Sequence, residues 1–267
     1  VEPTASSSIR RLADNLRLSD RLPEALELLS LGAATNPQDA LMLGVLAEVQ
    51  WLSEQRDQAL DTLQRAVKID SNYTWAWNKL ATWSAERDSV RTPVSLAREL
   101  VLERPNDSTN WLRLFEYLPQ DAHQEKLDAL DRALALSPLD SDLHDAKIRY
   151  LAELSRYEEA FQASTPEVWG ERPPLPLQGR RCWLWAHMGK LEEAVKEMTR
   201  LLEKEPDYYF GLLMVAHWLS TLNREVEALT HLRKVVELQP ESADALLMLA
   251  QALEKQGEDS REILRRA

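Results

Sequence analysis

The residues that could carry out chemistry are few and scattered in this sequence. The chain has five histidines, which are scattered from position 123 onward: His123, His144, His187, His217 and His231. None forms a pair at the i, i+4 spacing by which a helix presents two metal ligands, and no glycine-rich phosphate loop is present. Acidic pairs such as Glu192 and Glu193 begin predicted helices, where carboxylates complement the helix dipole. We therefore expect no catalytic residue, no metal, no cofactor and no enzymatic activity.

The remaining bulk properties exclude several partners. The single cysteine, Cys182, can form neither an internal disulfide nor a paired-cysteine metal site, so we expect a small core residue. A net charge of -12, from 44 acidic and 32 basic residues, argues against nucleic acid as a partner. No run of about 18 apolar residues exists, which predicts no membrane span. With no targeting segment visible, we expect a cytoplasmic protein.

Turn-forming residues recur at a nearly constant interval, and these define the elements of the fold. The series is Pro3, Pro37, Ser71, Pro105, Pro138, Pro173, Pro206 and Pro240, with separations of 34, 34, 34, 33, 35, 33 and 34. Each follows an apolar helical segment, and proline ends a helix because it lacks an N–H donor and disfavours helix in the residue before it. Few glycines and abundant Ala, Leu, Glu and Arg predict an all-α chain in which each interval is a pair of helices.

Two further patterns share this interval. Small residues lie early in each second helix, where two helices must cross closely: Ala25, Ala59, Ala160, Ala194 and Ala228. Pro93 and the region of Lys126 interrupt that series. Each first helix carries two large apolar residues three positions apart: Ile9 and Leu12, Leu43 and Leu46, Trp77 and Leu80, Trp111 and Leu114, Leu212 and Val215, Leu246 and Leu249. A small residue follows in most of them, which completes one buried helical face.

These three patterns resemble the tetratricopeptide repeat, a 34-residue helix-turn-helix unit. The best matches are "ALMLGVLAEVQWLSEQRDQALDTLQRAVKIDS" and "DYYFGLLMVAHWLSTLNREVEALTHLRKVVELQP". The resemblance covers the whole chain as seven repeats and part of an eighth. It implies a right-handed superhelical solenoid of antiparallel helix pairs, with a polar leader over residues 1–8 and a single solenoid over 9–267.

The sequence departs from the repeat at three places. Pro93 stands where the pattern requires alanine, so the second helix of repeat three should start near Val94. The second helix of repeat five, from Tyr157, meets four prolines and a glycine, which predicts a short helix and an irregular break at 165–176 that separates 9–164 from 177–267. The eighth repeat is incomplete at Ala267, and the chain begins with Val1, so we expect a piece of a longer protein, with possible self-association through the open C-terminal repeat.

The nine tryptophans and the cations divide between core and groove. By register, five tryptophans are expected in the core and one in the irregular segment: Trp77, Trp83, Trp111, Trp185, Trp218 and then Trp169. In the family, fixed positions of the first helices line an inner groove. Carried onto this sequence, they are Trp51, Trp75, Asn78, Lys79, Arg113, Arg149, Arg180, Trp183 and His217. The resemblance thus implies a partly basic, aromatic groove for a peptide or protein with acidic and apolar side chains.

Three functions are compatible with these features. The leading hypothesis is a scaffold or adaptor that binds a protein segment in the groove, as a module of a larger protein or complex. The runs "IDSNYTWAWNKLATW" and "RPNDSTNWLRLFEYL" also resemble the Asn-x-x-x-Trp repeats of protein prenyltransferase alpha subunits, although the arginine of that motif is missing. A third reading makes the segment the substrate-recognition arm of a glycosyltransferase or protease whose catalytic domain lies outside this sequence.

Overall fold

The computed structural model describes residues 3–87, 92–165, 167–170 and 172–266. All regular secondary structure in these ranges is helical. The chain forms two compact units, an N-terminal unit (Val1–Ser137) and a C-terminal unit (Pro138–Ala267). In both, each helix packs against the next one along the chain. The expected all-α array of helix-turn-helix repeats is therefore confirmed.

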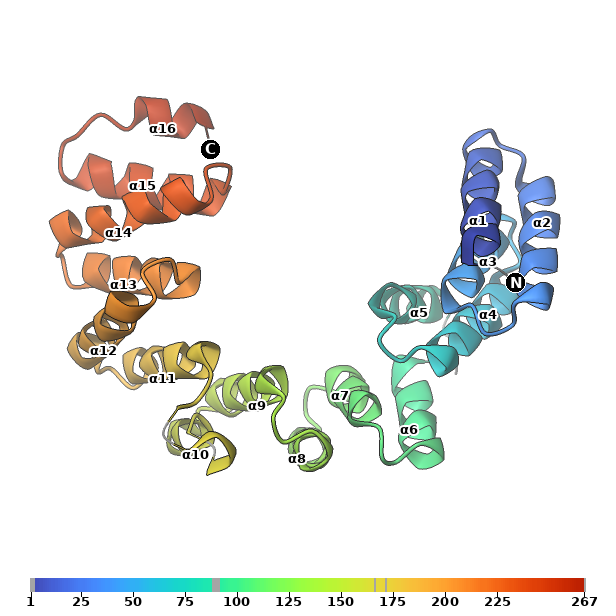
Figure 1. Cartoon of the computed structure of the whole chain (residues 1–267), viewed down its shortest axis with the longest axis horizontal. Coiled ribbons are helices and arrows are strands. Elements are labelled where there is room, and N and C mark those ends of the chain that lie inside the picture. Colours follow the sequence, from blue (N-terminus) through green and yellow to red (C-terminus); the bar gives the residue numbers. More distant parts are fainter. Residues whose placement is uncertain (1–2, 88–91, 166, 171, 267) are drawn as a thin grey trace. The chain divides into compact units, whose positions relative to one another are not determined.

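Each unit contains four helix pairs, labelled in Figure 1. The N-terminal unit consists of α1 (Pro3–Leu18), α2 (Leu22–Thr35), α3 (Ala40–Leu52), α4 (Arg56–Ile69), α5 (Thr74–Glu86), α6 (Pro93–Glu103), α7 (Ser108–Tyr117) and α8 (His123–Leu136). The C-terminal unit consists of α9 (Ser141–Glu153), α10 (Tyr157–Ala163), the 3-10 turn η1 (Glu167–Trp169), α11 (Leu175–His187), α12 (Leu191–Lys204), α13 (Tyr209–Thr221), α14 (Glu225–Leu238), α15 (Ala243–Lys255) and α16 (Arg261–Arg266). Odd-numbered helices are the first helices of their repeats and even-numbered ones the second.

The small residues predicted at the helix crossings are all fully buried. They are Ala25, Ala59, Ala160, Ala194 and Ala228, each with no exposed surface. Where the series is interrupted, Pro93 and Lys126 are buried in their place. The Lys126 ammonium group donates to the Phe115 carbonyl (2.8 Å), so a long side chain is tolerated at this crossing because its charge finds a backbone acceptor.

The paired apolar residues of the first helices form the hydrophobic cores of the two units. Trp77 is fully buried, and Trp83 and Trp218 are buried as predicted. Three predicted core residues are more exposed. Leu12 is 52% exposed, Trp111 is half-buried because its indole N–H reaches out to the Pro105 carbonyl (2.8 Å), and Trp185 lies at the edge of a pocket.

Two local departures from the repeat follow their sequence signals. Helix α6 begins at Pro93, one residue before the predicted start, and Thr92 caps it by accepting a hydrogen bond from the backbone N–H of Ser95 (3.2 Å). Helix α10 ends after seven residues, and the chain then passes through η1 to α11. Within 165–176 the described residues contain no α-helix before Leu175, while Pro166 lies outside them.

The boundaries of the larger parts differ from those expected. Helix α1 begins at Pro3, so the proposed leader is helical over residues 3–8, and residues 1–2 lie outside the described ranges. The two compact units meet at Ser137 and Pro138, rather than at the irregular segment. The irregular segment lies inside the C-terminal unit, because α9, which precedes it, packs directly against α11, which follows it.

Candidate functional site

The predicted groove residues of the N-terminal unit form an aromatic cluster on α3 and α5. Trp51 stacks on Trp83 with their ring centroids 4.4 Å apart and an interplanar angle of 5°. The Lys79 ammonium group lies over both Trp75 and Trp83, at 5.7 and 5.6 Å from their ring centroids. Asn78, one residue before Lys79, is exposed. Lys79 is thus held between two indoles, and its charge is already partly satisfied within the chain.

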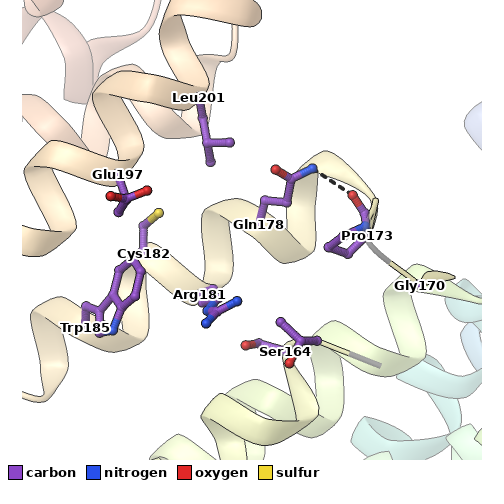
Figure 2. Close-up of a pocket in the computed structure, with 10 residues that line it drawn as sticks. Ser164, Gly170, Pro173, Gln178, Arg181, Cys182, Trp185, Glu197 and Leu201 are labelled. Atoms are coloured by element: carbon purple, nitrogen blue, oxygen red, sulfur yellow. Dashed lines mark hydrogen bonds between the residues drawn. The ribbon is translucent and has the colours of Figure 1, made fainter. Parts of the chain in front are cut away.

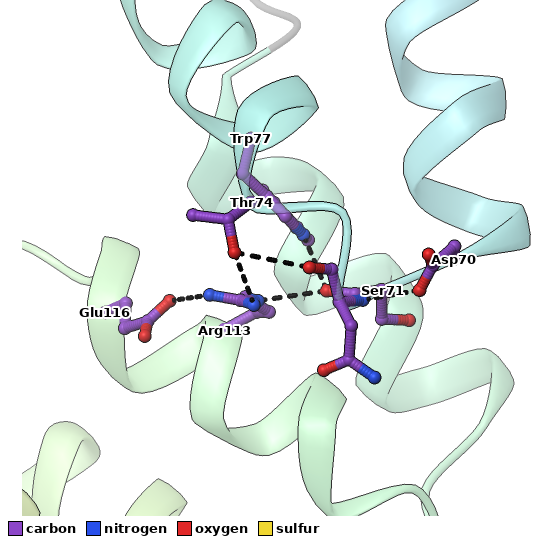
Figure 3. Close-up of polar contacts among 7 residues, drawn as sticks. Asp70, Ser71, Thr74, Trp77, Arg113 and Glu116 are labelled. Carbon is purple, nitrogen blue, oxygen red and sulfur yellow. Dashed lines mark hydrogen bonds and ion pairs between the residues drawn. The ribbon is translucent and has the colours of Figure 1, made fainter. Parts of the chain in front are cut away.

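Arg113 has an internal role that its predicted position did not indicate. It is only 8% exposed. Its Nε donates to the Ser71 carbonyl (2.9 Å), Nη2 to the Thr74 hydroxyl (3.3 Å) and Nη1 to the Glu116 carboxylate (2.6 Å) (Figure 3). Trp77 donates to the same Ser71 carbonyl from its indole N–H (3.0 Å). Arg113 therefore fastens α7 to the turn before α5, and we exclude it from the partner-binding surface.

Ser71 explains why the proline series has a gap at this turn. The residue is buried, and its hydroxyl donates to the side-chain carbonyl of Asn110 (2.7 Å), which is itself fully buried. The Asn110 amide in turn donates to the carbonyls of Leu100 (3.4 Å) and Arg104 (3.3 Å). Proline has no group that could replace this hydroxyl, so the polar network requires serine here.

The predicted residues of the C-terminal unit lie along α9, α11 and α13. Arg180 makes a bidentate ion pair with Asp145 (Nε–Oδ1 2.6 Å, Nη2–Oδ2 3.1 Å) and lies over the rings of Trp183 (5.0 Å) and Phe210 (5.2 Å). The exposed Arg149 contacts the same carboxylate at 3.5 Å. Asp145 therefore neutralises much of the positive charge that the sequence assigned to this face.

Beyond this ion pair, a shallow groove follows α11, α13 and α15. Its first hollow has a volume of about 370 Å³ between α11 and α13, and its second, of about 270 Å³, lies between α13 and α15. His217 and Thr221 line both hollows, so the two hollows adjoin along α13. We call this the C-terminal groove and define it by Trp183, His187, Leu191, Met214, His217, Trp218, Ser220, Thr221, Met248, Gln251 and Lys255.

Two of the nine predicted partner-binding residues thus line the C-terminal groove, and the other seven lie outside it. Trp183 and His217 lie in the C-terminal groove, with His217 exposed and Trp183 half-buried against His187. Met214, Met248 and Gln251 also line it, and the sequence reasoning did not select them. Their positions on first helices could have been read from the repeat register, but their unremarkable residue types gave no signal.

The C-terminal unit also contains a pocket that is separate from the C-terminal groove and that the sequence did not predict. A pocket of about 550 Å³ opens between the end of α10, α11 and α12 (Figure 2). Its lining includes Gln178, Arg181, Cys182, Trp185 and Glu197. Burial raises the pKa of the Cys182 thiol to about 12, with the Glu197 carboxylate adding to that effect and the Arg181 cation opposing it. Cys182 is therefore a buried, protonated thiol, as its expected core role requires.

Two further properties of the described residues concern metal binding and membrane crossing. In the part of the chain that the structure describes, no group of three or more His, Cys, Asp or Glu residues is placed to hold a metal ion. None of the described helices combines the length and apolar character needed to cross a bilayer.

Comparison with known proteins agrees with this architecture. Residues 227–267 match the sequence profile of the tetratricopeptide repeat family. No curated protein matches the sequence. Among solved structures, a tetratricopeptide repeat protein from Parabacteroides merdae is similar over 94% of this chain and 99% of its own, at 13% identity and a TM-score of 0.53. The profile match places a tetratricopeptide repeat at residues 227–267, and the structural likeness shows that the chain as a whole shares the fold of the Parabacteroides merdae protein.

Two other solved structures are similar at lower scores. PilW, a type IV pilus biogenesis factor, is 14% identical over 85% of this chain and 89% of its own, with a TM-score of 0.44. YrrB, a tetratricopeptide repeat protein with an unusual peptide-binding site, is 16% identical over 86% of this chain and 97% of its own, with a TM-score of 0.40. These scores are too low to carry an argument about this chain.

Proposed function

We propose that the chain is a protein-interaction module, acting as a scaffold or adaptor, and that it binds an extended peptide or protein segment in the C-terminal groove. The observation that carries this proposal is that two adjoining hollows share His217 and Thr221 as lining residues. Together they follow three successive first helices, which suits a segment of several residues rather than a compact small molecule.

The lining of the groove favours a partner with apolar side chains. The half-buried Trp183 supplies flat apolar surface, and Met214 and Met248 supply flexible apolar contacts that adapt to irregular shapes. His217, Thr221 and Gln251 provide the hydrogen-bonding groups that fix the direction of a bound segment. Affinity should therefore come from a few buried anchors, with the polar groups giving specificity.

Charge supports a smaller role for acidic side chains of the partner. The exposed Arg149 shares Asp145 with Arg180, so one carboxylate faces two guanidinium groups at this end of the face. An acidic residue of the segment would complete the pairing of Arg149. The aromatic cluster of Trp51, Trp75, Asn78 and Lys79 is a separate candidate contact in the N-terminal unit, where Asn78 is exposed.

A peptide-display selection on the immobilised chain tests the proposal. The selected peptides are measured by calorimetry against the wild-type chain and against a Trp183→Ala, His217→Ala double variant. We expect binding to weaken at least about tenfold, because truncation of a central aromatic anchor typically costs 2 kcal/mol or more. The matched control is His231→Ala, since His231 lies on the second helix α14 outside the C-terminal groove.

Each outcome of this experiment is informative. Loss of binding in the double variant with wild-type binding in His231→Ala supports the groove. Selected peptides that bind both variants with unchanged affinity would place the interaction elsewhere and refute the groove assignment. Failure to select any peptide from a large library, with the chain folded by circular dichroism, would count against peptide recognition altogether.

A further inference from the structure

The pocket between α10, α11 and α12 exists because one helix is short. The second helices of the neighbouring repeats, α8 and α12, have 14 residues each, whereas α10 has seven. The missing residues correspond to about 10 Å of helix at 1.5 Å per residue. Within the C-terminal unit, the full-length second helices α12 and α14 each pack against the first helix that follows them. Here the chain leaves the helix after Ala163, and the face of α11 that would be covered stays open as a pocket of about 550 Å³.

The register of α11 against α3 shows that the lining of this pocket is unusual. Gly44 receives the Tyr73 ring and Gly179 receives the Tyr208 ring in the same way, each tyrosine oxygen lying 2.3 Å from where a Cβ would stand. Gly179 lies 135 positions after Gly44, and Tyr208 lies 135 positions after Tyr73. Each residue of α11 therefore corresponds to the residue of α3 that lies 135 positions earlier.

In this alignment Gln178 and Arg181 occupy the two positions that hold Leu43 and Leu46 in α3. The same positions hold Leu212 and Val215 in α13, and all four of these apolar residues are buried. Two polar residues therefore stand on the buried face of α11 where the repeat normally places core residues. Polar groups at such positions reduce stability unless they find partners, so their presence here calls for a ligand-related role.

Arg181 is only partly satisfied by the chain. Its guanidinium carbon lies 4.5 Å from the Phe161 ring centroid and 5.5 Å from that of Trp185. These contacts engage the face of the guanidinium group and leave its N–H donors, which point outward in its plane. The Nε atom of Arg181 is buried and has no hydrogen-bond partner in the part of the chain that the structure describes.

We propose that this pocket binds a carboxylate group of a peptide, with Arg181 as the principal donor. A planar guanidinium group held by aromatic rings presents a fixed fork that matches a carboxylate. Glu197 lines the pocket from α12 and adds negative charge, which disfavours a dianionic phosphate relative to a singly charged carboxylate. The Gln178 amide donates to the Pro173 carbonyl (2.7 Å) and so holds the loop that forms one wall (Figure 2).

Nuclear magnetic resonance of the arginine side chains tests this assignment directly. The Nε–H signal of Arg181 is identified by its loss in Arg181→Leu and is followed during titration. The probes are acetyl-Ala-Phe with a free C-terminal carboxylate, acetyl-Ala-Glu-Phe-amide with a side-chain carboxylate, acetyl-Ala-Phe-amide with neither, and inorganic phosphate. We expect one or both carboxylate probes to shift the signal, and their difference tells a chain terminus from an acidic side chain.

Substitution gives the second arm of the test. Arg181→Leu restores the apolar residue of the other repeats, so it should fold, and it should weaken binding of the carboxylate probe about tenfold to a hundredfold. Arg132→Leu, at an exposed position on α8, is the matched control and should bind normally. Unchanged affinity in Arg181→Leu, no signal shift with either carboxylate probe, or a stronger response to phosphate would each overturn the proposal.

Discussion

Replacement of Arg113 by methionine tests the assignment of this residue to the interior. Methionine keeps most of the packing of the side chain and removes its charge. The main loss is the buried bond from a charged donor to the Ser71 carbonyl, which is worth about 1.5–3 kcal/mol. The ion pair with Glu116 adds roughly 0.5 kcal/mol, because the Glu116 side of the pair is exposed and solvent screens it. The Ser71 carbonyl keeps its bond from Trp77, so no acceptor is left unpaired. We expect a destabilisation of about 2–3 kcal/mol.

Two measurements together check this magnitude. Urea unfolding followed by far-UV circular dichroism gives the overall change, and hydrogen exchange with mass spectrometry locates it, because repeat arrays need not unfold in a single step. Protection should fall in the turn before α5 and in α5 itself, with little change in the C-terminal unit. Arg132→Met, exposed on α8, is the control and should stay within about 0.5 kcal/mol of the wild type.

The opposite result has a clear meaning. If Arg113→Met unfolds within about 0.5 kcal/mol of the wild type and the turn keeps its protection, the bonds to Ser71 and Thr74 do not stabilise the fold. Arg113 would then be available to a partner, as its position in the repeat first suggested, and its exclusion from the binding surface would be wrong.

Three further predictions concern packing and pH. Gly179→Ala should displace the Tyr208 ring, since the new Cβ would stand 2.3 Å from its oxygen; the pKa of Tyr208, raised to about 12 by burial, should then fall toward its ordinary value in a titration of tyrosinate absorbance. Burial raises the pKa of the Cys182 thiol from 9.0 to about 12. The stabilisation that this thiol gives the folded chain is therefore complete below pH 9 and is lost as the pH rises to about 12. Between pH 8 and 11 the urea midpoint of Cys182→Ala should fall less than that of the wild type. Ala228→Leu should cost about 1–3 kcal/mol in thermal unfolding because no space exists at this helix crossing, whereas Ala243→Leu, at an exposed position, should be nearly neutral.

The predicted site residues differ in how well their surroundings could be foreseen. Their places on first helices followed from the 34-residue interval, and His217 is indeed exposed in a hollow. The charge of the face was not foreseeable in the same way. The charge of Arg180 is neutralised by Asp145, 35 residues earlier, and Arg113 donates a hydrogen bond to a carbonyl 42 residues earlier. No pattern within one repeat indicates such pairings, because they depend on side chains that adjacent repeats bring together.

The helix pairs themselves could be read from the sequence because their signals are local. Proline either ends a helix or stands in the first turn of the next one, and a helix crossing favours a small residue such as Ala194, so both patterns indicate helix boundaries and contacts without reference to distant residues. The pocket at α10 is different. The prolines after α10 predicted an irregular segment. The opening over α11 and the unpaired Nε of Arg181 depend on packing, because they form only when Phe161, Trp185 and Glu197 surround the space that the short helix leaves. Local chemistry therefore specified the repeats, and packing between repeats created the sites on them.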